Sequence, residues 1–160
     1  MKNICYVQGD ATRPQGEGSK IIAHVCNDIG RWGKGFVLAL SRRSPEPERA
    51  FLRWFAGREE NDYALGSVQF VQLEIDLCVA NMIGQHKVRL EDDEGPAPVR
   101  YHAIEQALAK VGEKALELQA SVHMPRIGCG LAGGEWEKIE PLIIKNLSQR
   151  DVEVFVYDLA

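Results

Sequence analysis

Two patterns of hydrophobic and polar residues alternate along the chain. Near-continuous apolar runs of strand length, 20–26 (KIIAHVC) and 77–83 (LCVANMI), are typical of strands covered on both faces of a sheet. The segment 99–118 instead repeats its apolar residues every three or four positions, which predicts a long amphipathic helix. In chain order, the pattern predicts strands at 2–7, 20–26, 67–71, 77–83, 121–127 and 152–157, and helices at 36–43, 46–55, 99–118 and 136–147.

This alternation of strands and helices predicts an α/β protein, a three-layer α/β/α sandwich around a mixed, mostly parallel sheet. The segments 67–71 and 77–83 are expected to pair as a hairpin through 73–76. A charged segment with Pro and Gly, 89–98, predicts a surface loop. Ligands of such folds bind at the carboxyl ends of the strands, so loops that lead from strands into helices are the first place to look for function.

Composition narrows the class of protein. The chain has 160 residues, 45% hydrophobic and 26% charged, which is ordinary for a globular protein and argues against disorder or a coiled coil. No apolar run approaches the roughly 18 residues of a membrane-spanning helix, and the first residues lack a signal peptide, so a cytoplasmic location is expected. The net charge of −4 disfavours a broad electrostatic grip on nucleic acid.

The four cysteines, Cys5, Cys26, Cys78 and Cys129, are far apart and form no Cys-x-x-Cys pair. This spacing disfavours both a zinc site and a disulfide framework, and no metal is expected. Cys5, Cys26 and Cys78 lie in apolar runs, where buried reduced thiols are expected.

Two loops that follow strands are rich in glycine. The loop 30–36 (GRWGKGF) follows the strand 20–26, and the loop 128–134 (GCGLAGG) follows the strand 121–127. Glycine lets backbone N–H groups approach a ligand closely, and the helix that begins next directs its free N–H groups to the same place. Two such loops in one domain suggest a diphosphate held between them, although glycines that only form tight turns are the plain alternative.

The second loop also matches the G-x-G-x-x-G fingerprint of dinucleotide-binding folds through Gly128, Gly130 and Gly133. That fingerprint normally opens the first βαβ unit, with several strands still to come. Only one helix and one strand are expected after this loop, so a hydride-transferring dehydrogenase is disfavoured.

The segment 124–131 (MPRIGCGL) resembles the phosphate loop of macrodomains, which are ADP-ribose-binding modules. The start 9–12 (GDAT) is similar to the G-D-[IL]-T motif of the family, and 24–27 (HVCN) stands where many members have N-A-A-N. The loop 33–35 resembles the first phosphate-side glycine loop, and the final strand 154–159 also fits. This ordered resemblance spans nearly the whole chain, implies a single macrodomain over 1–160, and is closest to the branch that removes ADP-ribose from glutamate and DNA.

The resemblance implies roles for particular side chains. Asp10 would accept a hydrogen bond from the adenine amino group, Asn27 would orient the distal ribose, and Lys34 would pair with phosphate. Phe36 would line the sugar pocket. The plain alternatives are an Asx turn, a loop cap, a solvated lysine and a core aromatic residue. The full set of ligand-binding residues that the resemblance implies is Asp10, Ala11, Asn27, Gly33, Lys34, Gly35, Phe36, Ile127, Gly128, Cys129, Gly130 and Leu131.

Two further side chains, Trp32 and Cys129, each have a functional and a structural interpretation. Trp32 in the first glycine loop could cover the ligand or pack at the surface. Cys129 lies near a helix start, which can favour a thiolate nucleophile, but the resemblance implies a structural role. His24 and His123 lie within strand runs and are expected to be structural.

The hydrolase branch of the family uses a lysine that attacks the sugar and an aspartate that assists it. The corresponding positions here are Gln85 and Ala132, and neither side chain can do that chemistry. A shifted alignment would reach Lys87, but nothing replaces the aspartate. We therefore do not expect lysine-dependent removal of ADP-ribose.

Other macrodomain activities use a positioned water, for example in removing the terminal phosphate of ADP-ribose 1″-phosphate. Asn27, Asp28 and His86 are the candidate catalytic residues for such a reaction, since histidine transfers protons near neutral pH. A hydrogen-bonded structural role is the alternative for His86.

The sequence thus predicts an ADP-ribose-binding macrodomain that hydrolyses an ADP-ribose derivative, either the 1″-phosphate or an ADP-ribosyl or acetyl ester. The alternative is a non-enzymatic reader of free or protein-linked ADP-ribose, and a nucleotide-binding α/β protein outside the family is a third possibility. The expected partner is ADP-ribose or an ADP-ribosylated substrate, with no cofactor, no membrane and no sequence-specific nucleic acid.

Overall fold

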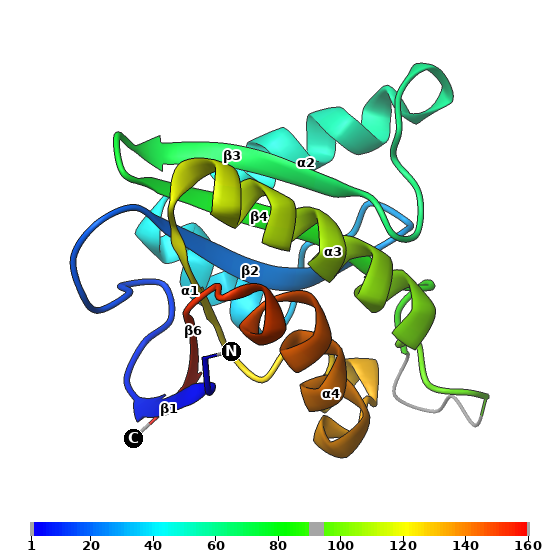
Figure 1. Cartoon of the computed structure of the whole chain (residues 1–160). Coiled ribbons are helices and arrows are strands. Elements are labelled where there is room, and N and C mark those ends of the chain that lie inside the picture. The colour runs from blue at the N-terminus through cyan, green and yellow to red at the C-terminus, as the bar shows by residue number, and fades with distance from the viewer. Residues whose placement is uncertain (1, 90–94, 160) are drawn as a thin grey trace.

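The computed structural model describes residues 2–89 and 95–159, which form one six-stranded sheet with helices on both faces (Figure 1). The strands are β1 (Cys5–Gln8), β2 (Lys20–Asn27), β3 (Val68–Glu74), β4 (Leu77–Gln85), β5 (Ser121–Met124) and β6 (Val154–Asp158). The helices are α1 (Phe36–Arg43), α2 (Glu46–Ala56), α3 (Tyr101–Leu118) and α4 (Trp136–Asn146), with short 3₁₀ turns η1 (Arg58–Glu60), η2 (Gly130–Ala132) and η3 (Ser148–Arg150).

The sheet is mixed and mostly parallel, as the sequence predicts. Its strand order is β1-β6-β5-β2-β4-β3. Only β3 runs antiparallel, and it pairs with β4 as the predicted hairpin; the other neighbours are parallel. The carboxyl ends of β2, β4 and β5 therefore meet at one edge of the sheet, followed by the loops that carry the candidate site.

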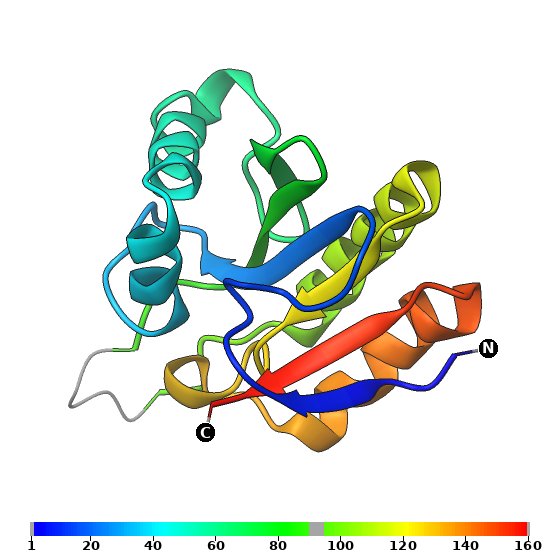
Figure 2. The ribbon, with the colours of Figure 1, turned by 90° about the vertical axis from the view of Figure 1, so that its left-hand side faces the viewer.

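Helices cover both faces of the sheet, α1 and α2 on one face and α3 and α4 on the other (Figure 2). Alternate residues of β2 show how this arises, because successive side chains of a strand point to opposite faces. Ile21 and Ala23 pack in the core cluster with α3 and α4, whereas Ile22 packs with Leu40 of α1. Burial on both faces explains the continuous apolar runs of the sequence and confirms the three-layer sandwich.

Several element ends differ from the prediction. The strand β5 ends at Met124 rather than at 127, because Pro125 has no N–H to continue the ladder and the chain turns there. The helix α3 begins at Tyr101, since the preceding Val99 forms an isolated bridge with Gln85. Part of the predicted loop 89–98, residues 90–94, lies outside the described residues.

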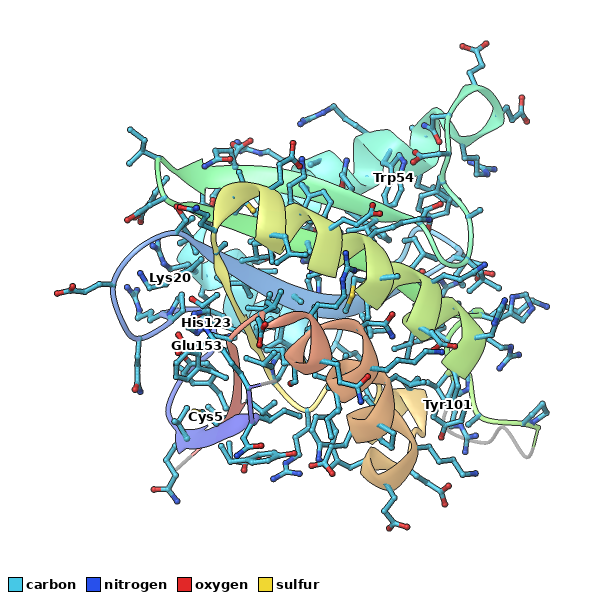
Figure 3. The ribbon with its side chains drawn as sticks, viewed as in Figure 1. Cys5, Lys20, Trp54, Tyr101, His123 and Glu153 are labelled. Atoms are coloured by element: carbon cyan, nitrogen blue, oxygen red, sulfur yellow. The ribbon has the colours of Figure 1, made fainter. Side chains whose placement is uncertain are left out.

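The prediction that Cys5 is buried is wrong. β1 is an edge strand that pairs only with β6, and Cys5 lies exposed on it (Figure 3). Cys26 and Cys78 lie on the central strands β2 and β4 and are buried as free thiols. An apolar run therefore predicts burial well only where the strand has neighbours on both sides. None of the helices that the structure describes has the length and apolar character needed to cross a membrane.

Candidate functional site

Two adjoining cavities lie at the carboxyl ends of β2, β4 and β5. The first, here called the β2–β4 cavity, has a volume of about 290 Å³ and includes Asn27 and Val88 in its lining. The second, the β2–β5 cavity, has a volume of about 500 Å³ and is lined by parts of both glycine loops. The residues that line both cavities are Val25, Lys34, Val37, Gln85 and Leu131.

The two glycine loops, some ninety residues apart in the sequence, face one cavity. Residues 34–37 of the β2–α1 loop and 125–132 of the β5–α4 loop line the β2–β5 cavity together. Every predicted ligand residue except Asp10 and Ala11 lines at least one of the two cavities. The parallel order of β2 and β5 brings the loops together, because it places both strand ends at the same edge.

The glycines of these loops differ in whether packing or backbone conformation requires a glycine there. A Cβ at Gly128, whose φ is +72°, would lie 2.9 Å from Ile139 Cδ1, so packing and backbone conformation both require glycine there. A Cβ at Gly134 would lie 2.3 Å from the Gly128 carbonyl oxygen. Gly33 needs neither explanation, since its φ is not positive and open space surrounds its Cβ position. Part of the second glycine pattern is therefore structural.

Asn27 lies at the end of β2 and uses its amide group to shape the loop that follows. Its Oδ1 accepts hydrogen bonds from the N–H groups of Ile29 and Arg31, at 3.1 and 3.0 Å. Its Nδ2 donates to the Arg31 carbonyl at 2.7 Å. Asn27 thus caps the loop, as the plain interpretation holds. Among the described residues only one N–H of its amide has a partner, and Asn27 also lines the β2–β4 cavity.

Two aromatic side chains, Tyr63 and Trp32, hold the same loop in place. The Tyr63 hydroxyl donates to the Asn27 carbonyl at 2.8 Å and accepts from the Gly30 N–H at 3.1 Å. Trp32 packs edge-on against His24, with ring centroids 5.4 Å apart, and donates through Nε1 to Ser41 Oγ at 2.8 Å. The half-buried ring of Trp32 therefore packs against the sheet and α1, and a role in covering the ligand stays a prediction.

Asp28 joins the end of β2 to the end of β4. Its Oδ2 accepts from His86 Nδ1 at 2.7 Å, and its Oδ1 accepts from the Lys87 N–H at 2.7 Å. Lys87 has a positive φ of 58°, an uncommon backbone conformation that this contact helps to hold. Asp28 and His86 line neither cavity, although their neighbours Asn27 and Gln85 do. Both carboxylate oxygens of Asp28 thus have partners, and one of these contacts orients the ring of His86.

Gln85 and Ala132 stand where the hydrolase branch has its lysine and aspartate, and both have structural contacts. Gln85 lines both cavities, and its Nε2 donates to the Lys87 carbonyl at 2.9 Å. Ala132 is buried, and its carbonyl accepts from the Val99 N–H at 3.0 Å. The side chain of Lys87 does not line either cavity.

Four cations line the cavities, three more than the sequence analysis assigned to the site. Arg31 and Arg89 line the β2–β4 cavity, Arg126 lines the β2–β5 cavity, and Lys34 lines both. Asp and Glu do not occur among the described residues of either lining. Arg89 lies in no recognised motif, so only the fold reveals it, whereas Arg31 lies in the first glycine loop and Arg126 in the segment 124–131, where the sequence already pointed to a phosphate.

Arg126 is held in place at the outer wall of the β2–β5 cavity. Its guanidinium donates to both carboxylate oxygens of Asp158, at 2.8 and 3.0 Å, and lies 5.1 Å from the ring centroids of Tyr6 and Trp136. The hydrogen bond with Asp158 raises the pKa of Arg126. The pKa of the neighbouring Cys129 is raised by burial and lowered in part by Arg126, which disfavours a thiolate nucleophile at neutral pH.

Asp10 and Ala11 lie apart from the cavities. Asp10 follows the edge strand β1, and its Oδ1 accepts from Thr12 N and Thr12 Oγ1 at 2.9 and 2.7 Å, which is an Asx turn. A ligand that reaches both Asn27 and Asp10 must therefore extend beyond β5 towards β6 and β1. Among the described residues, no group of three or more His, Cys, Asp or Glu side chains is arranged to hold a metal ion.

Comparison with known proteins gives strong likenesses, although no family model matches the chain. A macrodomain protein from Streptomyces coelicolor is 56% identical with a TM-score of 0.86, and the match covers 98% of this chain and 99% of that one. A Lodderomyces elongisporus protein named ADP-ribose 1″-phosphate phosphatase is 25% identical over 97% of this chain and 99% of its own length.

A mouse protein named chromodomain-helicase-DNA-binding protein 1-like is 36% identical over 97% of this chain. The chain spans only 18% of the length of that relative, so the likeness concerns one part of it. The near-complete match to the Streptomyces protein agrees with the sheet order and with the two glycine loops at the ends of β2 and β5. The chain therefore belongs to the macrodomain family.

Proposed function

We propose that the chain binds ADP-ribose across the two cavities and hydrolyses an ADP-ribose derivative, the 1″-phosphate or an ADP-ribosyl or acetyl ester, with a positioned water. The observation that carries this proposal is the β2–β5 cavity, which two glycine loops and cationic side chains line and from which carboxylates of the described residues are absent. Such a cavity suits a diphosphate, because backbone N–H groups and cations both stabilise phosphate oxygens.

Different residues would contact the diphosphate, the distal ribose and the adenine of ADP-ribose. The backbone at Gly35, Gly128 and Gly130 would contact the diphosphate, and Lys34 would pair with it, since Lys34 lines both cavities. The free N–H of the Asn27 amide would bind the distal ribose in the β2–β4 cavity. The adenine would lie towards Asp10, beyond the cavities.

The chemical step requires a base that takes a proton from water. Asp28 fixes the orientation of His86 through Nδ1, which leaves Nε2 to accept that proton. His86 lines neither cavity, so the reacting water would have to bridge its ring and a ligand held in the cavity beside Gln85. For a phosphate substrate, the water oxygen bonds to phosphorus, the bond from phosphorus to the sugar oxygen breaks, and the proton passes to that oxygen.

The name of the Lodderomyces relative supports the phosphatase form of this proposal. The alternative of a non-enzymatic reader is supported by Gln85 and Ala132, which cannot replace a catalytic lysine and aspartate. Incubation with each substrate separates the two: release of phosphate or acid, reduced in a His86→Gln variant that still binds ADP-ribose, supports the enzyme. Intact substrate after prolonged incubation, with binding preserved, supports the reader.

Binding is tested by calorimetric titration with ADP-ribose, with AMP and ATP as competing nucleotides. We expect affinity in the micromolar range for ADP-ribose and weaker binding of AMP and ATP. Lys34→Gln, which removes a charge shared by both cavities, should weaken binding by about tenfold. Lys138→Gln, on the exposed side of α4, is the matched control and should bind as the wild type does. A folded protein that does not bind ADP-ribose overturns the proposal.

A further inference from the structure

His24 lies on the central strand β2 and also forms part of the wall of the β2–β5 cavity. Only 2% of the residue is exposed. Its ring packs against Phe36, another residue of the same lining, with ring centroids 5.8 Å apart, and against Trp32 at 5.4 Å. The ring is therefore buried by its neighbours and adjoins the space where the proposed ligand lies.

The hydrogen bonds around His24 fix which ring nitrogen carries the proton. Gln69 Nε2 donates to the Ala50 carbonyl at 2.9 Å, so Gln69 Oε1 is the acceptor that faces Asn81. Asn81 Nδ2 donates to this oxygen at 3.0 Å and to the Pro47 carbonyl at 3.2 Å. The other end of the Asn81 amide, Oδ1, is thus an acceptor, and it lies 2.5 Å from His24 Nε2. Nε2 must therefore carry the proton.

The second ring nitrogen of His24, Nδ1, is consequently a bare acceptor. Burial lowers the pKa of His24 to about 4, so the ring is neutral at pH 7 and Nδ1 has no proton. Its only polar contact among the described residues is Cys26 Sγ at 3.9 Å, and the same sulfur lies 3.8 Å from Nε2. A sulfur equally far from both nitrogens is not in line with the lone pair of Nδ1, and a thiol is a weak donor. A buried acceptor without a good donor is costly, so Nδ1 calls for a donor from a ligand.

The chemistry of Nδ1 restricts the group that it binds. The phosphate oxygens of a diphosphate are acceptors at neutral pH, and the proposed function places them against the glycine loops and Lys34. The same proposal places the adenine towards Asp10, beyond the cavities, so its amino group is out of reach. The donors of ADP-ribose that remain are the hydroxyl groups of the two riboses, which flank the diphosphate on either side.

We propose that His24 is a ligand-binding residue whose Nδ1 accepts a hydrogen bond from a ribose hydroxyl group of ADP-ribose. This contact makes the site selective for the intact sugar, because a ligand without that hydroxyl leaves a buried acceptor unpaired. The inference rests on the proposed function and adds a residue that recognises the sugar of the same ligand. The distal ribose and the adenosine ribose both carry such hydroxyls, and the test distinguishes them.

The first test observes the ring nitrogens of the wild-type protein by NMR with isotope-labelled histidine. His86→Gln and His102→Gln identify the signals of these two residues. Tyr157→Phe moves those of His123, whose Nδ1 contacts the Tyr157 hydroxyl, so the remaining signals belong to His24. We expect Nε2 of His24 to be protonated and Nδ1 to be unprotonated in the free protein. Saturating ADP-ribose should move the Nδ1 signal in the direction that a new hydrogen-bond donor causes, while Nε2 keeps its proton.

The second test uses ADP-ribose analogues that each lack one hydroxyl group of the distal ribose or of the adenosine ribose. One of them should bind without moving the Nδ1 signal, and it identifies the ribose that supplies the donor. Calorimetry should show that this analogue binds about tenfold more weakly than ADP-ribose, the loss expected for one hydrogen bond. In His24→Gln, whose amide can still donate to Asn81, the two ligands should bind about equally. His123→Gln, at the other buried strand histidine, lines neither cavity and is the matched control that should keep the difference.

An Nδ1 signal that saturating ADP-ribose leaves in place overturns the inference, and so does a signal that every analogue moves equally, since water is then the donor. A ring that becomes protonated at both nitrogens also overturns it, because the ring then faces a phosphate. If His24→Gln does not fold, the NMR comparison on the wild type decides alone. In all these cases bound ADP-ribose leaves the proposed function standing, whereas a folded protein that does not bind ADP-ribose overturns both proposals.

Discussion

Single residues in the candidate site differ in whether the fold or the ligand explains them. Gly128 is needed by the fold, because a Cβ there would press on Ile139 and the backbone is left-handed. Gly33 has neither constraint and lines the β2–β4 cavity, where the proposed function places the distal ribose. An added methyl group should therefore disturb the fold at Gly128 but not at Gly33, so Gly33 can be used to test ligand binding without a change in folding.

Replacing Gly33 with alanine should weaken ADP-ribose binding by about tenfold without destabilising the protein. The free energy of unfolding should stay the same or rise by up to about 1 kcal/mol, since alanine restricts the unfolded chain. Calorimetry and urea unfolding measure the two effects. Gly95→Ala, at another exposed glycine without a positive φ, is the control and should leave affinity unchanged. Unchanged affinity in Gly33→Ala would mean that the ligand does not approach this backbone.

Tyr63 is expected to position the loop of Asn27 without contacting the ligand. Tyr63→Phe removes a hydroxyl that donates to the Asn27 carbonyl and accepts from the Gly30 N–H, so it should cost about 1–2 kcal/mol of stability. Because the loop carries one wall of the β2–β4 cavity, affinity for ADP-ribose should fall as well. Tyr101→Phe, which removes a hydroxyl bonded to the Glu135 N–H, should lower stability alone. Full affinity in Tyr63→Phe contradicts the positioning role.

Among the elements, the three strands β2, β4 and β3 share a buried chain of hydrogen bonds. His24 Nε2 on β2 donates to Asn81 Oδ1 on β4 at 2.5 Å, and Asn81 Nδ2 donates to Gln69 Oε1 on β3 at 3.0 Å. Asn81 also donates to the Pro47 carbonyl at the start of α2, at 3.2 Å. One fully buried amide thus ties three strands to the helical layer above them.

Asn81→Ala should therefore lower the free energy of unfolding by about 3 kcal/mol or more, because it leaves several buried polar groups without partners. Asn3→Ala, at an exposed position before β1, should change stability by less than about 0.5 kcal/mol. Urea unfolding of both variants gives the comparison. A loss below about 1 kcal/mol in Asn81→Ala would show that these groups find other partners.

The sequence predicts the elements better than it predicts the walls of the cavities. The strands β2 and β4 are long apolar runs, so their existence and their burial follow from pattern alone. The glycine loops can also be predicted from the sequence, because their glycines lie close together along the chain. The contribution of Arg89 could not be predicted in this way, because Arg89 reaches the site only through the order of the strands, which brings segments distant in sequence together. Asp10 shows the converse, a motif residue that lines neither cavity.

Over the whole molecule, charge is distributed unevenly. The chain has a net charge of −4, yet the described linings of both cavities carry four cations and no carboxylate. The low pI disfavours a broad nucleic-acid surface and permits local capture of a small anion. Net charge alone therefore hides the feature on which the proposed function depends.

Stability of the whole molecule should fall in mild acid because two histidines are buried. Burial lowers the pKa of His24 and of His123 to about 4, below the usual value of 6.5. Between these values the unfolded chain binds protons that the folded chain does not. The stabilisation is complete above about pH 6.5 and is lost as the pH falls towards 4, on the order of 3 kcal/mol for each histidine.

Figure 3 labels His123, which lies on β5 between Ser121 Oγ and the Tyr157 hydroxyl, each 2.7 Å from a ring nitrogen. Urea unfolding at pH 7, 5.5 and 4.5 measures the expected loss, and NMR titration of the histidine rings assigns it. His102→Gln, at an exposed histidine of α3, should leave the pH dependence unchanged. Normal pKa values for both buried rings would contradict this account.

The most direct test of the central claim is a crystal structure of the chain with ADP-ribose. The account predicts the diphosphate in the β2–β5 cavity, between the loop of Gly35 and the loop of Gly128, with Lys34 beside it and the distal ribose next to Asn27. A ligand bound with its diphosphate outside these two loops would contradict the account, even if the affinity were high.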